Sequence, residues 1–217
     1  MPTADAPTLP DGIVVVVKEE CATCHSVGSV LRQLADATTL TVYTQDDPRF
    51  PESPTPIHDS DLSVSWHHRI ETVPTVINVV DGVETQRTVG WHRDEWERVT
   101  GVDGLGPDLP AMRPGCGSMS VDPDLVDELN VRFGATSLAS RRIEVADAED
   151  DIEMMFTRGW SDGLPVVPPT EARVMKMLTG TTRAPSDVVA TVPPDLVDVT
   201  VEKVAVAAVM ALSLIHI

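Results

Sequence analysis

Short β-branched runs alternate with segments of helical spacing along the first part of the chain. Residues 13–17 (IVVVV) are apolar without alternation, which is typical of a strand buried on both faces of a sheet. Apolar positions within residues 27–34 follow helical spacing, and residues 39–44 (TLTVYT) again favour a strand. A proline-rich loop separates that strand from a second helical segment at residues 59–70. This part of the chain is therefore predicted to run β-α-β-α.

A hairpin and a third helix are predicted next. Residues 76–80 and 83–89 are rich in strand-forming side chains, and an Asp-Gly pair separates them. Asp-Gly suits a two-residue type I′ turn, because both turn positions need positive φ. Residues 92–100 then favour a short helix. The expected order is β-α-β-α-β-β-α, which assigns residues 1–101 to the α/β class.

The pattern changes after residue 101. Residues 102–115 are rich in glycine and proline and lack periodicity, which is typical of a flexible linker. We therefore expect residues 116–211 to form a separate, incomplete and mainly helical domain of unknown function. Helical spacing returns there in residues 121–132, 152–156, 171–178 and 200–210.

The last residues, 212–217 (LSLIHI), match the translation of a transposase end sequence that is used in sequencing libraries, and they begin inside a helical pattern. We interpret them as a non-native scar and leave them out of the fold prediction. On this interpretation the natural protein continues beyond Ala211, and the chain is a fragment.

Charge and composition narrow the classes of function. The chain has 217 residues, of which 16 are basic and 34 acidic, with a formal net charge of −18. Because phosphate binding needs clustered Lys and Arg, neither nucleic acid nor an anionic membrane is an expected partner. The N-terminus has no signal-peptide pattern, and no run of about 18 apolar residues could span a bilayer. We therefore expect a cytoplasmic protein.

The most informative motif is Cys21-Ala-Thr-Cys24-His25, where the first predicted strand meets the first predicted helix. Unpaired N–H groups and the helix dipole stabilise a thiolate at a helix N-terminus, which marks Cys21 as the nucleophile. Cys24 lies one turn further on, where it can attack a mixed disulfide and release the reduced partner. The spacing therefore predicts a dithiol–disulfide site, and no cofactor or metal is expected.

Other interpretations of the motif stay open. C-x-x-C-H also attaches c-type haem, with His25 as an iron ligand, and cysteine pairs can bind zinc. Haem is disfavoured because its attachment normally follows export, and zinc because the sequence has no second C-x-x-C pair. A further alternative is an adaptor domain that keeps the fold for protein contacts only, without redox activity.

Three landmarks resemble the thioredoxin/glutaredoxin family over residues 12–101. The C-x-x-C motif follows the first strand, Val73-Pro74 precedes the hairpin, and Gly90 leads into the last helix. The sequence departs from the family at one point, because two glutamates replace the tryptophan that usually precedes the first cysteine.

This resemblance implies a thioredoxin-like mixed sheet and a thiol–disulfide oxidoreductase. It implies that Pro74 is cis and faces the cysteine pair, and that Cys21 is an exposed attacking thiol. The backbone of Val73 is then free to bind an extended substrate, which is a protein or a small thiol or disulfide.

A second resemblance covers residues 145–211. The DGLPVVPPT stretch is similar to the start of an uncharacterised bacterial family, sometimes found beside proteins with a U/C-G-S-C motif, and residues 116–119 (CGSM) match three positions of that motif. Two roles for Cys116 stay open. It is either an idle thiol or a client of the Cys21/Cys24 pair, in which case the protein's partner includes its own C-terminal domain.

Overall fold

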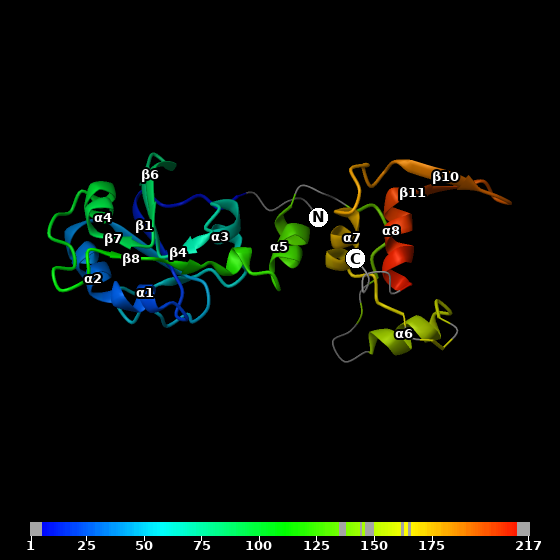
Figure 1. Ribbon diagram of the computed structural model, residues 1–217, viewed down its shortest axis with the longest axis horizontal. Coiled ribbons are helices and arrows are strands. Elements are labelled where there is room, and N and C mark those ends of the chain that lie inside the picture. Colours follow the sequence, from blue (N-terminus) through cyan, green and yellow to red (C-terminus); the bar gives the residue numbers. More distant parts are fainter. Residues whose placement is uncertain are drawn as a thin grey trace. The chain divides into compact units, whose positions relative to one another are not determined.

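The structure, a computed structural model, describes residues 6–134, 138–143, 145, 150–161, 163–164 and 166–211. The chain forms two compact units, Met1–Leu129 and Asn130–Ile217, here called unit 1 and unit 2 (Figure 1). Among the helices in these ranges, none is both long and apolar enough to cross a membrane.

A five-stranded mixed sheet forms the centre of unit 1, in the order β3-β2-β1-β5-β6 (Figure 1). Its strands are β1 Gly12–Val17, β2 Leu40–Thr44, β3 Ile57–His58, β5 Thr75–Val80 and β6 Val83–Val89. β1 runs parallel to β2 and antiparallel to β5, and β5 and β6 form the predicted hairpin. The expected α/β class with a central mixed sheet is confirmed.

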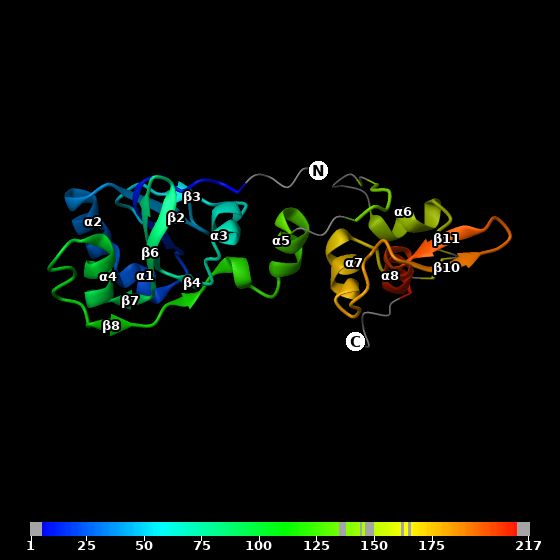
Figure 2. The same ribbon diagram turned by 90° about the horizontal axis from the view of Figure 1, so that it is seen from above.

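The helices of unit 1 are α1 Ala22–Ser26, α2 Gly28–Ala37, α3 Ser63–His67 and α4 Arg93–Thr100. α2 and α4 lie on one side of the sheet and α3 on the other (Figure 2). The helix predicted after the cysteines is divided at Val27, which ends α1 and precedes α2. α3 is shorter than predicted, because the backbone turns at Leu62 through a left-handed conformation with φ of 59°.

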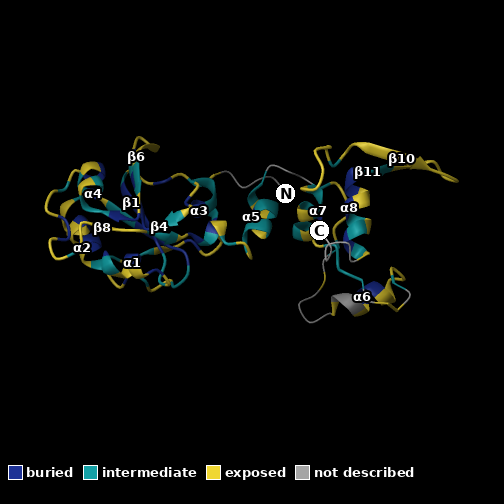
Figure 3. Ribbon diagram, viewed as in Figure 1, coloured by how far each residue is buried: buried dark blue, intermediate teal, exposed yellow. Residues whose placement is uncertain are grey.

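The core of unit 1 is built around β1. Residues 14–17 have no exposed surface, which confirms the prediction of a strand buried on both faces (Figure 3). Trp91 and Trp96 are also buried and pack edge to face, with ring centroids 5.1 Å apart. Cys21 and Cys24 belong to the same cluster. The cysteine pair is therefore backed by a packed core.

Residues 102–115 are not a flexible linker, which corrects the prediction. Within this segment β8 Met112–Arg113 pairs with β7 Trp91–His92. The guanidinium group of Arg93 donates hydrogen bonds to three carbonyl oxygens of the segment, those of Leu105, Gly106 and Leu109. Carbonyl groups of glycine and proline in this segment accept hydrogen bonds from side chains of unit 1. The segment therefore lies in a fixed position on the surface of that unit.

The chain stays on unit 1 beyond the predicted linker. β9 Cys116–Gly117 pairs with β4 Thr72–Val73, and a 3₁₀ helix at Met119–Val121 follows. The division between the units lies at Leu129, so the predicted boundary at residue 101 is wrong.

Unit 2 is built on a pair of helices, α7 Glu171–Leu178 and α8 Val201–Met210, which match two predicted helices. Their contact is a small apolar cluster of Val174, Ala205 and Val209. α6 Asp151–Thr157 also lies in this unit, and α5 Val126–Phe133 crosses the division between the units.

Unit 2 also contains a hairpin that the sequence analysis did not predict. β10 Val188–Val192 and β11 Val197–Thr200 pair antiparallel and extend away from α7 and α8 (Figures 1 and 2). This hairpin corrects the expectation of a mainly helical segment. It forms because the segment is rich in β-branched side chains, which favour strands. The tail at 212–217, and positions 162 and 165 of the DGLPVVPPT stretch, lie outside the described residues.

Candidate functional site

Cys21 is the N-cap residue of α1. Its Sγ accepts a hydrogen bond from the backbone N–H of Cys24 at 3.4 Å. The sulfur therefore lies where a helix presents unpaired N–H groups, and Cys24 follows within the first turn. These are the positions that the sequence predicts for the two cysteines.

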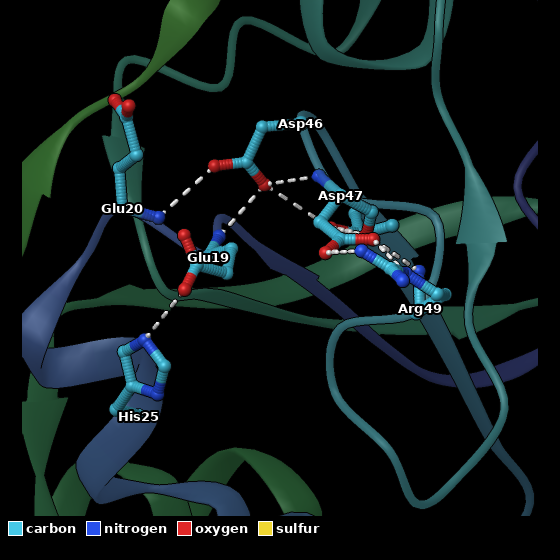
Figure 4. A network of polar contacts seen from close by, with 7 residues as sticks. Glu19, Glu20, His25, Asp46, Asp47 and Arg49 are labelled. Carbon is cyan, nitrogen blue, oxygen red and sulfur yellow. Dashed lines mark hydrogen bonds and ion pairs between the residues drawn. The ribbon is translucent and has the colours of Figure 1, made fainter.

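The turn between β1 and α1 is held by the carboxylate of Asp46, which lies just after β2 (Figure 4). Asp46 accepts hydrogen bonds from the backbone N–H groups of Glu19 (2.7 Å), Glu20 (3.0 Å) and Asp47 (2.9 Å). Burial raises the pKa of Asp46, but the N–H donors outweigh it and the net pKa is lowered. Asp46 thus fixes the two residues that precede Cys21.

His25 is directed toward this turn (Figure 4). Its Nε2 lies 3.5 Å from a carboxylate oxygen of Glu19, and its ring packs on Phe50 with centroids 4.7 Å apart. The imidazole therefore ties the surface of α1 to the acidic turn.

Both sulfurs of the pair are covered. Cys21 and Cys24 have no exposed surface, so the exposed thiol that the family resemblance implies is corrected. The Val73–Pro74 bond is cis, and the Cys21 thiol donates to the carbonyl oxygen of Val73 at 3.5 Å. The backbone of Val73 is not free either, because it pairs with Cys116.

Residues 112–117, here called the strap, lie against the elements that carry the pair. Side chains from the end of β1 and from α1 contact it. Thr23 Oγ1 donates to the Pro114 carbonyl (2.6 Å) and Lys18 Nζ to the Gly117 carbonyl (3.0 Å), while Ser26 Oγ accepts a hydrogen bond from the Arg113 guanidinium. The strap is therefore bound on the cysteine side as well as along β4.

Two glycines allow the strap to approach β4 closely. A Cβ atom at Gly115 would lie 2.4 Å from Thr72 Cγ2 and 2.7 Å from the Val73 carbonyl oxygen. Gly90 faces the same contact, with its own Cβ position 2.9 Å from the Gly115 nitrogen and a φ of 67°. Any larger residue at Gly115 must displace the strap.

The chain beyond the strap is anchored by a buried polar cluster. Gln45, at the end of β2, donates through Nε2 to Ser65 Oγ (2.7 Å) and Ser118 Oγ (2.6 Å). Its Oε1 accepts the N–H of Met119 at 3.0 Å, and Ser120 Oγ donates to the carbonyl of Ile70. These hydrogen bonds fix the residues that follow Cys116.

The three cysteines are free thiols with different acidities. Burial raises the pKa of Cys21, but a hydrogen bond with the Cys116 side chain and the Cys24 N–H donor outweigh it, so the net pKa is lowered. Burial raises the pKa of Cys24, and the nearby Cys21 sulfur raises it further. The pKa of Cys116 is raised, first by burial and then by its hydrogen bond with Cys21. Cys21 is therefore the most acidic thiol of the three.

The structure brings the sequence-predicted site residues to one place. These are Cys21, Cys24, Val73 and Cys116, and Pro74 follows Val73 in the chain. Sequence reasoning missed the supporting residues Gln45, Asp46 and Gly115. A polar Gln-Asp-Asp run directly after the second strand was a usable signal for the first two, and the glycines on both sides of Cys116 were a signal for the third.

Comparisons of the chain with protein families, with curated proteins and with solved structures found no match. Across the part of the chain that the structure describes, no group of three or more His, Cys, Asp or Glu residues is arranged to hold a metal ion.

Proposed function

We propose that unit 1 is a thioredoxin-like domain that catalyses thiol–disulfide exchange through Cys21 and Cys24. The observation that carries this proposal is the position of Cys21, whose sulfur caps α1 and accepts the N–H of Cys24. A sulfur in that place is stabilised as the thiolate, which is the attacking species in disulfide exchange. The order of helices and strands around the mixed sheet supports the same family.

The reaction proceeds in two steps. The Cys21 thiolate attacks one sulfur of a substrate disulfide, forms a mixed disulfide and releases the other substrate sulfur as a thiolate. Cys24 then loses its proton and attacks Cys21 Sγ, which releases the second substrate thiolate and leaves a Cys21–Cys24 disulfide. Two electrons pass to the substrate, which is a protein or low-molecular-weight disulfide. The pKa values support these roles, because the nucleophile is the more acidic thiol and the resolving thiol is protonated at rest.

Two matched substitutions test this assignment. With glutathione disulfide as substrate and dithiothreitol as reductant, Cys21→Ser should reduce the rate to the uncatalysed level. Cys24→Ser should instead accumulate a Cys21–glutathione adduct or a product of that adduct, detected by intact mass. Both changes replace sulfur by oxygen at buried positions, so a general folding defect would affect them alike. Full activity of Cys21→Ser would refute the proposal.

A second candidate is a redox-inactive adaptor domain. It is favoured by the complete burial of Cys21 and by the occupied backbone of Val73. An equilibrium titration with reduced and oxidised glutathione separates the two functions. An oxidoreductase forms the Cys21–Cys24 disulfide over a defined potential range, whereas an adaptor keeps both thiols reduced throughout.

A further inference from the structure

The edge of unit 1 beside the cysteine pair is occupied by the protein's own chain. The register pairs Val73 with Cys116 and Thr72 with Gly117, in antiparallel strands. Adding an extended strand to an open backbone edge is a common way to bind a peptide, with main-chain hydrogen bonds for affinity and side chains for specificity. The strap therefore lies as an extended peptide substrate would lie.

The residue of the strap that meets the reactive sulfur is itself a cysteine. Cys116 is the strap residue that pairs with Val73, and the carbonyl oxygen of Val73 accepts a hydrogen bond from the Cys21 thiol at 3.5 Å. The side chains of Cys21 and Cys116 are also near enough to shift each other's pKa values. Because both cysteines lie beside Val73, a small movement of the strap is enough to bring their sulfurs together. Cys116 is partly exposed, while Cys21 and Cys24 are covered.

We infer that the strap is an internal substrate strand and that Cys116 is a third reacting thiol, which exchanges disulfides with Cys21. This inference rests on the proposed function, because it needs Cys21 to react with disulfides. Cys116 lies on a docked strand and not on a flexible tether. The position of this strand is set by its pairing with β4 and by the close approach at Gly115.

The exchange balances without an added oxidant once the pair is oxidised. Reduction of a substrate disulfide leaves the Cys21–Cys24 disulfide. The Cys116 thiolate attacks Cys21 Sγ, the Cys21–Cys116 bond forms, and Cys24 leaves as a thiolate and is protonated. In the reverse step the Cys24 thiolate attacks Cys21 Sγ and Cys116 leaves. One disulfide forms as another breaks, so no electrons are gained or lost.

The same geometry limits access by other substrates. An external peptide that pairs with Val73 must first displace β9, and Cys21 becomes accessible only when the strap moves. The docked strap therefore competes with external substrates at a high effective concentration. Small disulfides need a smaller displacement than peptides, so they are the better probes of the intact protein.

The test uses the full chain with the resolving thiol removed. Cys24→Ser protein at low concentration is treated with glutathione disulfide, quenched with acid and mapped by mass spectrometry. Cys21 first forms a mixed disulfide and releases glutathione. Cys116 then attacks Cys21 Sγ and releases the second glutathione. The expected product is a monomer with a Cys21–Cys116 disulfide.

Two further substitutions in the same background give a matched comparison. Gly115→Ala must displace the strap, whereas Gly117→Ala on the same strand meets no atom within 4 Å. We expect Gly117→Ala to keep the crosslink yield and Gly115→Ala to lower it by about tenfold, as the effective concentration of Cys116 falls. Circular dichroism checks folding. If Gly115→Ala does not fold, Arg113→Ala replaces it and should lower the yield by about threefold, because it removes one of several strap contacts.

The outcomes separate the two proposals. Glutathionylated Cys21 beside a free Cys116 in the Cys24→Ser and Gly117→Ala proteins would overturn the inference and leave the proposed function standing. An equal crosslink yield with Gly115→Ala or its replacement would also overturn it, because docking would then not position Cys116. Absence of any reaction at Cys21 in all variants would overturn both.

Discussion

The two units differ in how they cover their strands. In unit 1, residues 14–17 of β1 have no exposed surface, because helices lie on both sides of the sheet. In unit 2, all five residues of β10 are exposed, and Val188, Val189 and Val192 each keep nearly half of their surface in contact with solvent (Figure 3). The same type of side chain thus forms a core in one unit and a surface in the other.

This difference explains where the candidate chemistry lies. A reactive cysteine needs neighbours that hold their positions, and the strap site depends on contacts that tolerate little movement, such as the approach of Gly115 to Val73. A packed core resists such movement, because its side chains interdigitate with few voids. In the hairpin of unit 2 every residue of β10 is exposed, so that strand offers no such support.

The largest expected effect on stability comes from placing a charge in β1, compared with the same change in β10. Val16→Asp introduces a charge at a position with no exposed surface, and we expect it to lower the free energy of unfolding of unit 1 by more than about 4 kcal/mol. Val189→Asp makes the same change at a position that is 48% exposed, and we expect a change within about 0.5 kcal/mol. Urea unfolding followed by circular dichroism measures both. Similar losses would show that β10 is buried in solution.

A smaller effect contrasts buried and exposed hydrogen bonds. Gln45→Ala removes the hydrogen bonds of the Gln45 amide to Ser65 and Ser118 and leaves the buried Met119 N–H without its acceptor, and we expect a loss of about 2–3 kcal/mol. Thr191→Ala removes an exposed hydrogen bond to Asp198 on the hairpin, for which we expect about 0.5 kcal/mol or less. The Cys116 thiol should also be alkylated faster in the Gln45→Ala protein. An unchanged alkylation rate would show that Gln45 does not anchor the strap.

Local sequence patterns predicted several helices and strands of unit 1. The run at residues 13–17, the helical spacing after it and the Asp-Gly pair each correspond to an element of the structure, because each depends on residues close in sequence. The placement of Cys21 at the start of a helix followed from the same local signals.

The path of residues 102–117, which ends in the strap, could not be predicted in this way. Apart from β8, residues 102–115 have no regular secondary structure, and their positions are set by partners elsewhere in the chain, such as Thr23 for Pro114 and Arg93 for three carbonyl groups. Glycine and proline are typical both of a flexible linker and of a chain fitted closely to a surface. Sequence alone does not separate these two outcomes, and the burial of Cys21 depends on which of them occurs.

The smallest expected effect concerns one device that both units use, a carboxylate that accepts backbone N–H groups. Asp46 does so in unit 1 and Glu202 in unit 2, where it accepts the N–H groups of Ala139 (3.0 Å) and Ser140 (2.7 Å). For both groups burial raises the pKa, the hydrogen bonds outweigh burial, and the net pKa is lowered.

A folded-state pKa below the unfolded value means that the ionised carboxylate stabilises the fold above the unfolded pKa, about 3.9 for Asp, and that this stabilisation is lost as the pH falls further. Asp46 is partly exposed, so we expect Asp46→Asn to cost only about 1 kcal/mol at neutral pH after solvent screening, and the cost to shrink toward zero in acid. Urea unfolding at a series of pH values measures this. A cost that does not change with pH would mean that geometry, rather than charge, holds the turn.

Glu202→Gln sharpens the comparison, because it should show the same sign of pH dependence while acting on unit 2. Of these two carboxylates, Asp46 is the one that accepts the backbone N–H groups of Glu19 and Glu20, the residues before Cys21. Asp46→Asn should therefore change the rate at which Cys21 is alkylated, and Glu202→Gln should leave that rate as it is in the unmodified chain. If the two substitutions changed the alkylation rate of Cys21 equally, the acidic turn would have no specific part in positioning the nucleophile. The hydrogen bonds of Asp46 would then not be among the causes of the difference between the two units.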